Sequence, residues 1–237
     1  MVEIFKTANE LSEKAAVIFC KTAQEAVQEK GRFTVALTGG TSPAKLYELL
    51  SRSPYKESVP WDRTYVFWGD ERWVPLTDDK SNAKMTFETL LNHVPVPKNQ
   101  IFPMWGEAKP EDFDLKYEEQ LREYLGDTPQ FDLILLGMGD DGHTASLFPG
   151  TNVLHEQKRL VKAYYLSPQS MYRITLTALC INAAKKIIFL VLGEKKAPAL
   201  HEVLEGAYNP TWYPAQLIKP YDGELLWLAD ELAAQQL

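Results

Sequence analysis

One histidine stands in a segment rich in glycine and aspartate, directly after a run of apolar residues. The segment reads FDLILLGMGDDGHTASLFPG (residues 131–150) and places His143 behind Asp140 and Asp141. An imidazole can take a proton from water near neutral pH, and a neighbouring carboxylate can hold its second nitrogen and fix the tautomer. We therefore expect His143 to be a general base that Asp140 or Asp141 orients. We also expect it at or near the start of a short helix, whose dipole would keep the imidazole neutral.

A second segment, LTGGTSP (residues 37–43), has the composition of an anion-binding loop. Gly39 and Gly40 let the backbone approach a ligand closely, and Thr41 and Ser42 add hydroxyl groups. A helix is expected next, with Ser42 as its N-cap and a proline at its first position, so that its free N–H groups face the same spot. Taken alone, the segment fits a well-capped turn between a strand and a helix equally well.

Charged residues follow a further apolar run in WGDERWVP (residues 68–75). Asp70, Glu71 and Arg72 could pair with one another at the surface, which is the usual arrangement of such a run. Their position directly after a predicted strand favours a functional site instead, where Arg72 could offer its planar guanidinium to a carboxyl or phosphate oxygen.

Basic residues in two later segments complete the set of candidates. Arg173 lies in MYRITLT, and Lys195 and Lys196 lie in LGEKKAPAL after another apolar run. Such lysines are commonly solvated, but at the edge of a sheet one of them could join Arg173 in holding a phosphate.

The elements that must position these residues alternate between apolar strands and helices. Thr7 and Glu10 have the spacing of a capping box, and Gly31 is expected to end the helix that follows. Further helices are predicted after Ser42 and over residues 81–91, 111–125 and 230–236, and strands over residues 33–38, 65–68, 131–136, 186–192 and 225–228.

This alternation predicts one α/β domain over residues 1–237, with a mostly parallel sheet covered by helices on both faces. In such sheets, ligands bind beyond the carboxyl ends of the strands, which is where all the candidate residues stand. The proline-rich stretch over residues 94–110 could be a surface excursion, and the sequence leaves open whether it covers the site.

The composition excludes several classes of protein. A formal net charge of −7 argues against general nucleic-acid binding. No apolar run is long enough to span a membrane, and no secretory signal is visible. The two cysteines stand in apolar segments, which fits a reduced, cytoplasmic protein without a disulfide. The scattered histidines indicate no metal site, and Ser146 lacks the surroundings of a serine nucleophile.

Five segments together resemble the 6-phosphogluconolactonase family, from near Phe5 to the end of the chain. They are LTGGTSP, GDERWVP with the following Ser81 and Asn82, GMGDDGHTASLFPG, RITLT and GEKKAPAL. The chain departs from the family in two places, because Ala83 stands where a tyrosine is frequent and Gln216 where a serine is common.

The resemblance implies a Rossmann-like α/β/α sandwich that hydrolyses 6-phospho-D-glucono-1,5-lactone without a metal or an organic cofactor. It implies that His143 is the general base, that Arg72 lies in the active site, and that the phosphate is bound by a larger set of residues. That set is Gly39, Gly40, Thr41, Ser42, Arg173 and Lys196. We also expect Asp70 to bind the substrate and Asp141 to orient His143, with Asp140 as the alternative. The expected ligand is a sugar-phosphate lactone, and the oligomeric state stays open.

Two alternatives stand beside this interpretation. Amino-sugar phosphate deaminases of similar fold continue their glycine–histidine segment with a phenylalanine, an asparagine and a catalytic glutamate, whereas this chain has Ser146, Leu147 and Phe148. A sugar-phosphate-binding regulator without catalysis is the other alternative. It would keep the phosphate loop but have no need of His143.

Overall fold

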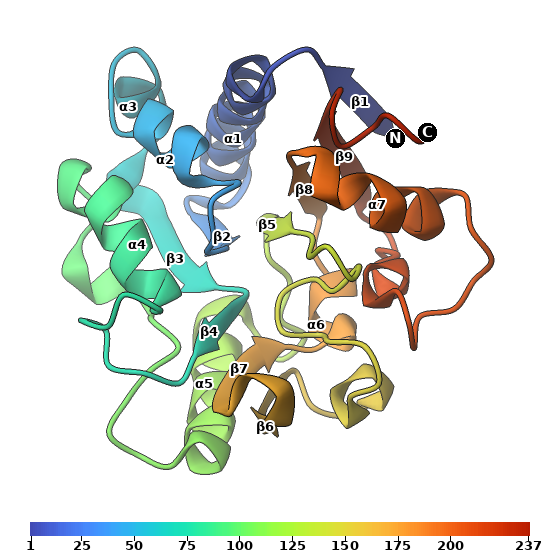
Figure 1. Cartoon of the computed structure of the whole chain (residues 1–237). Helices are drawn as coiled ribbons and strands as arrows, with labels where there is room; N and C mark the ends of the chain where they lie inside the picture. The colour runs from blue at the N-terminus through green and yellow to red at the C-terminus, as the bar shows by residue number, and fades with distance from the viewer.

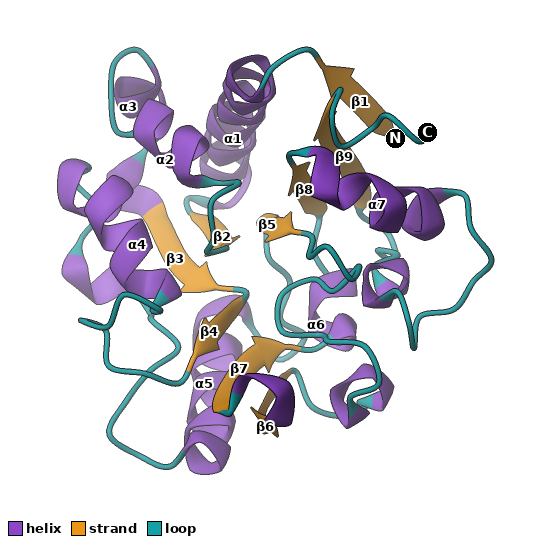
Figure 2. Cartoon of the chain, in the orientation of Figure 1, coloured by secondary structure: helices purple, strands orange, loops and turns teal.

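A six-stranded parallel sheet forms the centre of the computed structural model, which describes residues 1–237 (Figures 1 and 2). Its strands pair in the order β1-β9-β8-β5-β2-β3, and every pair is parallel. In chain order they are β1 (Val2–Phe5), β2 (Phe33–Leu37), β3 (Thr64–Trp68), β5 (Leu133–Gly137), β8 (Lys186–Val191) and β9 (Glu224–Asp230). The expected α/β class with a mostly parallel sheet is confirmed.

The strand order places a topological switch point between β2 and β5. From β2 the chain continues outward to β3, whereas from β5 it continues to β8 and β9 on the other side. Connections that leave neighbouring strands in opposite directions open a crevice at their carboxyl ends. The loop over residues 38–43 and the loop over residues 138–148 therefore start next to each other, at the centre of Figure 1.

A smaller antiparallel sheet was not predicted from the sequence. It contains β4 (Asp70–Arg72), β6 (Val161–Leu166) and β7 (Met171–Leu176), in the order β4-β7-β6. Within it, Arg72 pairs with Arg173 in the backbone register. Residues that we expected in the loop after β3 are thus a separate strand, which brings the charged residues of β4 and β7 together.

Helices flank the central sheet. They are α1 (Ala8–Lys30), α2 (Ala44–Leu50), α3 (Tyr55–Ser58), α4 (Asn82–Thr89), α5 (Pro110–Leu125), α6 (Ala178–Asn182) and α7 (Ala197–Leu204). The predicted cap of α1 is confirmed, because Thr7 Oγ1 accepts from Glu10 N and Glu10 Oε2 accepts from Lys6 N. Gly31 ends the helix at a φ of 77°. None of these helices is both long and apolar enough to cross a membrane.

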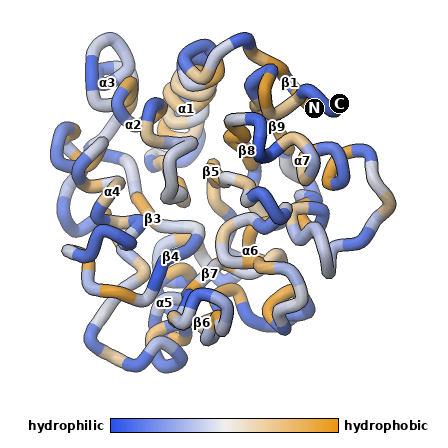
Figure 3. Tube along the Cα trace, viewed as in Figure 1, coloured by the Kyte–Doolittle hydropathy of each residue, from blue (hydrophilic) through white to orange (hydrophobic).

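Buried apolar side chains form one continuous cluster of 60 residues. The apolar colouring of β3, β5, β8 and much of α1 in Figure 3 follows this cluster, and blue segments are frequent in the outer loops. Cys20 and Cys180 are both buried and unpaired. The proline-rich stretch packs against β3, where Ile101 bridges to Val66.

The expected closing helix over residues 230–236 is wrong. Strand β9 continues to Asp230, and the residues beyond it form turns. Parallel pairing with β1 keeps Asp230 in the strand opposite Phe5, and its carboxylate accepts hydrogen bonds from Gly193 N at 3.0 Å and Ala233 N at 2.8 Å. The side chain of Asp230 thereby ties the end of β9 to the loop that follows β8.

Candidate active site

A small cavity of about 240 Å³ opens beyond the carboxyl ends of β2 and β5. Segments far apart in the sequence line it: the loop after β2, the loop after β5, strands β4 and β7, and the 3₁₀ turn Glu194–Lys196 after β8. Of the predicted site residues, the structure brings together Gly39, Gly40, Thr41, Ser42, Asp70, Arg72, His143, Arg173 and Lys196. Asp141 does not line the cavity, but its carboxylate is hydrogen-bonded to His143, which does. No residue between 94 and 110 lines the cavity.

The glycine loop lines this cavity and has free backbone hydrogen-bond donors. None of the four backbone N–H groups from Gly39 to Ser42 donates a hydrogen bond within the protein. The expected N-cap is wrong, because α2 begins at Ala44 after Pro43 and the Ser42 side chain caps no N–H group. The anion-binding capacity of the segment therefore lies in the loop backbone itself, which can surround an anion with several donors at once.

The side chain of His143 is held by Asp141 and not by Asp140. Asp141 Oδ1 lies 2.5 Å from His143 Nδ1 and also accepts from His143 N at 3.1 Å. Burial alone would raise the pKa of the Asp141 carboxyl, but the hydrogen bond and charge of His143 outweigh burial and lower this pKa. An ionised carboxylate can only accept, so in the neutral imidazole the proton sits on Nδ1 and the lone pair on Nε2.

No helix begins at His143, so the expected effect of a helix dipole is wrong. The chain turns at Gly142 and again at Ala145, where φ is 75° and 47°. Hydrogen bonds close the turn, from Gly139 N to His143 O at 2.8 Å and from Gly142 N to Gly139 O at 3.1 Å. The imidazole is therefore placed by a tight turn and a carboxylate.

Two glycines of the site have a steric role that the sequence did not reveal. A Cβ atom on Gly139 would lie 2.0 Å from His143 Nδ1 and 2.5 Å from Asp141 Oδ1. A Cβ atom on Gly39 would lie 1.8 Å from Oδ1 of Asn82. Any side chain at either position would thus displace a polar group of the site.

Phe148 supports the imidazole from one side. Its ring stacks on the His143 ring with centroids 4.0 Å apart and planes at 24°. The guanidinium of Arg173 lies 5.3 Å from the centre of the same phenyl ring. A carboxylate at residue 148, as in the deaminase segment, would therefore stand directly against His143.

Three of the five N–H groups of the Arg173 guanidinium are already bonded inside the protein. They donate to Asp70 Oδ2 at 3.0 Å, to Ser146 Oγ at 2.9 Å and to Gln169 Oε1 at 3.1 Å, and the residue is only 3% exposed. Ser146 in turn donates to Asp70 Oδ2 at 2.5 Å. The predicted contact of Arg173 with a phosphate stays a prediction, and the visible role of Arg173 and Asp70 is to join β4, β7 and the histidine loop.

The sequence segments that contain Asn82 and Arg72 were predicted to lie next to the site. In the structure, each of the two side chains has one buried polar atom without a hydrogen-bond partner. Asn82 donates to the Asp70 carbonyl at 2.9 Å, while its buried Oδ1 has no donor. Arg72 donates from Nη1 to Lys80 O at 2.8 Å, while its Nε has no acceptor. Arg72 lines the cavity, and its Nη2 donates to no acceptor within the protein. The two departures from the family, Ala83 and Gln216, line no part of this cavity.

Glu71 is fully buried and connects β4 to the start of α4. Its carboxylate accepts from the backbone N–H groups of Arg72, Asn82 and Ala83 at 2.7–2.8 Å and from Ser81 Oγ at 3.0 Å. Burial raises the pKa of Glu71 from 4.5 to about 7, against the lowering effect of the backbone hydrogen bonds. The folded protein therefore binds a proton here that the unfolded chain releases above about pH 5.

This proton makes the stability of the protein depend on pH. Because the folded pKa is raised, the contribution of Glu71 to the free energy of unfolding is largest below pH 4.5 and is lost as the pH rises through about 7. We expect the wild type to lose up to about 3 kcal/mol relative to Glu71→Gln between pH 5 and pH 8. Urea denaturation of both proteins at each pH measures this difference. A difference that does not change with pH would contradict the raised pKa.

Lys196 lines the cavity from the turn after β8, and its ammonium group forms an ion pair with Asp140 at 2.6 Å.

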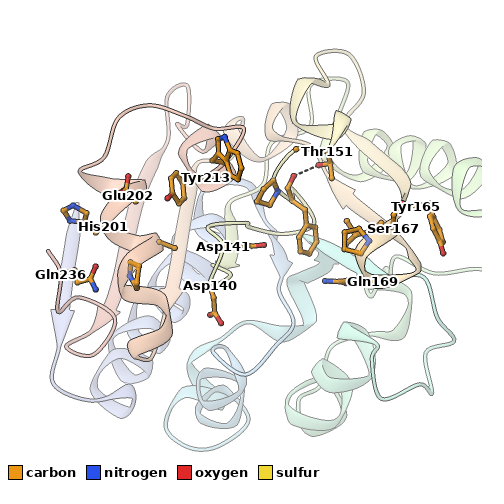
Figure 4. A pocket seen from close by; sticks show the side chains of 18 residues that line it. Asp140, Asp141, Thr151, Tyr165, Ser167, Gln169, His201, Glu202, Tyr213 and Gln236 are labelled. Carbon is orange, nitrogen blue, oxygen red and sulfur yellow. Dashed lines mark hydrogen bonds between the residues drawn. The ribbon is translucent and has the colours of Figure 1, made fainter.

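Asp140 and Asp141 also line a second, larger groove of about 850 Å³ next to the cavity (Figure 4). His201 and Glu202 of α7 stand on one side of this groove, and Tyr165, Ser167 and Gln169 on the other. The groove lacks the glycine loop and His143, so the predicted catalytic and phosphate-binding groups line the smaller cavity. Nowhere in the chain do three or more His, Cys, Asp or Glu side chains converge as a metal-binding group.

Comparison of the whole sequence with known proteins identifies its family. The sequence model of the family described as glucosamine-6-phosphate isomerases/6-phosphogluconolactonase matches residues 6–227. A relative from Synechocystis named 6-phosphogluconolactonase is 40% identical over 241 residues, which cover all of this chain and 98% of the relative. A 6-phosphogluconolactonase from Haemophilus influenzae is 38% identical over 86% of this chain and 87% of its own length.

Solved structures with the same fold carry two kinds of name. The 6-phosphogluconolactonase from Trypanosoma cruzi superposes with a TM-score of 0.86 at 26% identity, over all of this chain and 96% of that one. A monomeric glucosamine-6-phosphate deaminase superposes with a TM-score of 0.85 at 26% identity, over all of this chain and 99% of that one. The backbone alone therefore does not separate the two activities. By sequence and by fold, the chain belongs to the family of glucosamine-6-phosphate isomerases and 6-phosphogluconolactonases.

Proposed function

We propose that this protein is an enzyme that hydrolyses 6-phospho-D-glucono-1,5-lactone to 6-phospho-D-gluconate, a step of the oxidative pentose phosphate pathway. One observation carries the proposal: an imidazole with a free Nε2 and a loop with four free N–H groups line the same small cavity. The names of the most similar relatives support it. A phosphate at one end of a sugar ring would place the reacting carbonyl at the other end, near His143.

Binding of the phosphate would orient the ring for attack. The loop from Gly39 to Ser42 supplies backbone donors and hydroxyl groups, and Lys196 supplies a positive charge. Because the phosphate is remote from the reacting carbonyl, its binding energy can be used to hold the carbonyl in place. The buried ion pair of Arg173 and Asp70 holds β7 and β4 together beside this loop, and it contributes to the electrostatic potential of the cavity.

His143 would act first as a base and then as an acid. Nε2 takes a proton from water while the water oxygen adds to C1 of the lactone, and the carbonyl oxygen becomes an oxyanion. Arg72 lines the cavity, and its Nη2, which has no acceptor within the protein, could stabilise this oxyanion. When the tetrahedral intermediate collapses, the bond from C1 to the ring oxygen breaks and the imidazolium returns the proton to that oxygen. Asp141 stabilises the imidazolium in between.

Phe148 favours the lactonase over the deaminase. Ring opening and deamination of an amino sugar need a carboxylate where this chain has a phenyl ring stacked on His143. Lactone hydrolysis needs only an activated water and a stabilised oxyanion, so an apolar neighbour is compatible with it. The presence of an oriented His143 likewise argues against a regulator that only binds sugar phosphates.

Two parallel assays test the proposed function. The wild-type protein is incubated with freshly made 6-phosphogluconolactone, with the spontaneous hydrolysis rate subtracted, and separately with glucosamine 6-phosphate. We expect enzymatic hydrolysis of the lactone and no release of ammonia from the amino sugar. Release of ammonia without lactone hydrolysis would reverse the assignment.

Replacing Lys196 by alanine should weaken substrate binding more than it slows the chemical step. The variant loses the one lysine ammonium that lines the cavity, and a charge-assisted contact is worth about 1.5–3 kcal/mol. KM should therefore rise about 10- to 100-fold, with a much smaller change in kcat. Lys195→Ala removes an equal charge from the neighbouring residue, which does not line the cavity, and should leave KM unchanged. Steady-state kinetics of both variants decide this, and an unchanged KM in Lys196→Ala would reject its phosphate role.

Two further properties belong to this proposal. We regard residues 1–237 as one domain, which the single buried cluster shared by both sheets supports. The cytoplasm is the expected location, and imaging of the tagged protein in its own cells would test it.

A further inference from the structure

Two adjacent carboxylates each hold one of two basic groups of the cavity. Asp141 lies against His143, and Asp140 forms an ion pair with Lys196 at 2.6 Å. The side chains of Asp140 and Asp141 point in different directions from the same turn (Figure 4). The hydrogen bonds that close the turn at Gly139 fix this divergence.

Lys196 cannot use its full charge for a ligand while Asp140 holds it. A phosphate entering the cavity meets an ammonium group that already has an anionic partner, and it also meets the charge of that partner. We infer that Asp140 competes with the phosphate group of the substrate for Lys196, and so sets the affinity for phosphate-bearing ligands without taking part in the chemical step. This inference rests on the proposed function.

The surroundings of Asp140 allow the exchange. Its side chain is 56% exposed, whereas that of Lys196 is 22% exposed. Asp140 lines the larger groove and not the cavity, so a displaced carboxylate can turn into the groove without crossing the substrate site. Asp141 stays in place, because its hydrogen bonds go to the ring and the backbone of His143 and not to Lys196.

The competition also makes the site selective for charge. A phosphate dianion can replace a singly charged carboxylate at Lys196, because it carries the larger charge. A sugar lactone without phosphate has no group that can break the ion pair. Asp140 is therefore a specificity-determining residue that acts through Lys196.

The test is the variant Asp140→Asn, which keeps the size of the side chain and removes its charge. The dissociation constants of 6-phosphogluconate and of inorganic phosphate, measured by calorimetry, should fall about two- to fivefold, which is the range for one partly exposed ion pair. KM for the lactone should fall with them, and kcat should not rise. Glu202→Gln removes one charge elsewhere in the same groove and should leave both dissociation constants and KM unchanged.

A double-mutant cycle separates competition from a general effect of charge. In the Lys196→Ala background, Asp140→Asn should leave the dissociation constant of inorganic phosphate unchanged, because the shared partner is gone. The same gain in both backgrounds would overturn the inference, since it would show an action that does not depend on Lys196. A weaker or unchanged affinity in the single variant Asp140→Asn would also overturn it, since Asp140 would then only position the lysine.

Failure of this inference and failure of the proposed function give different results. Binding of inorganic phosphate is measured without turnover, so the cycle reads out the ion-pair exchange even in a protein that hydrolyses no lactone. Normal lactone hydrolysis with no gain of affinity in Asp140→Asn rejects the inference alone. Thermal unfolding of each variant shows that the fold is retained.

Discussion

Replacing His143 by alanine is expected to lower kcat about 100- to 10,000-fold, with little change in KM. The variant removes the only histidine of the cavity, and no other base replaces it, because Asp141 faces the missing ring and Lys196 is paired with Asp140. The phosphate loop is untouched, so the substrate should still bind. The measurement is steady-state hydrolysis of 6-phosphogluconolactone with the spontaneous rate subtracted.

The matched control for this variant is His155→Ala. His155 is exposed and lines neither the cavity nor the larger groove, so this substitution should leave both constants unchanged. Near-normal turnover of His143→Ala would remove the imidazole from the mechanism. A large rise in KM with an unchanged kcat would instead make His143 a binding residue.

Replacing Gly139 by alanine is the second change with a large expected effect. The new methyl group would lie 2.0 Å from His143 Nδ1 and 2.5 Å from Asp141 Oδ1, far inside contact distance. The imidazole and the carboxylate cannot both keep their positions, so kcat should fall at least about 100-fold, close to the effect of losing the base. KM should change much less, because the atoms nearest to the new methyl group belong to His143 and Asp141 and not to the phosphate loop.

The control for Gly139→Ala is Gly69→Ala at the end of β3. A methyl group there would meet its nearest atom, the carbonyl oxygen of Leu37, at 3.6 Å, which is ordinary contact. We expect this variant to stay active. The double variant Gly139→Ala/His143→Ala should be no slower than His143→Ala alone, because both substitutions act by removing the same base, His143, from its working position. A further loss in the double variant would show that Gly139 acts through something other than the histidine.

The main strands and the edge of the sheet that carries the site were predictable from the sequence. The apolar runs that became β2, β5 and β8 each end in glycine or charged residues, and the rule for parallel sheets then places their loops at one edge. That rule alone brought Gly39, His143 and Lys196 into one predicted site, which the structure places around a single cavity. The rule works because all of these strands run in the same direction.

The small sheet was not predictable, for a physical reason. Strand β4 has only three residues and directly follows β3, so no change in periodicity separates the two. Strands β6 (VKAYYL) and β7 (MYRITL) contain charged and polar residues and lack the continuous apolar character of the central strands. Their pairing with β4 is a long-range contact, which local patterns do not encode.

The distinction between the two aspartates also depended on geometry. Asp140 and Asp141 are identical in type and adjacent in sequence, and only the turn with its positive φ at Gly142 decides which one faces His143. The same turn occupies the position where we expected a helix to begin at His143. Similarly, nothing in the sequence tells that Gly39 must lack a side chain because Asn82 packs against it.

The central claim is that the imidazole and the phosphate-binding groups act on one ligand in one cavity. A crystal structure of the protein with bound 6-phosphogluconate tests this claim most directly. The account predicts the phosphate at the backbone N–H groups of Gly39–Ser42 and at Lys196, and the C1 carboxylate within hydrogen-bond distance of His143 Nε2. A phosphate bound in the larger groove beside Tyr165 and Glu202, or a C1 carboxylate pointing away from His143, would contradict it.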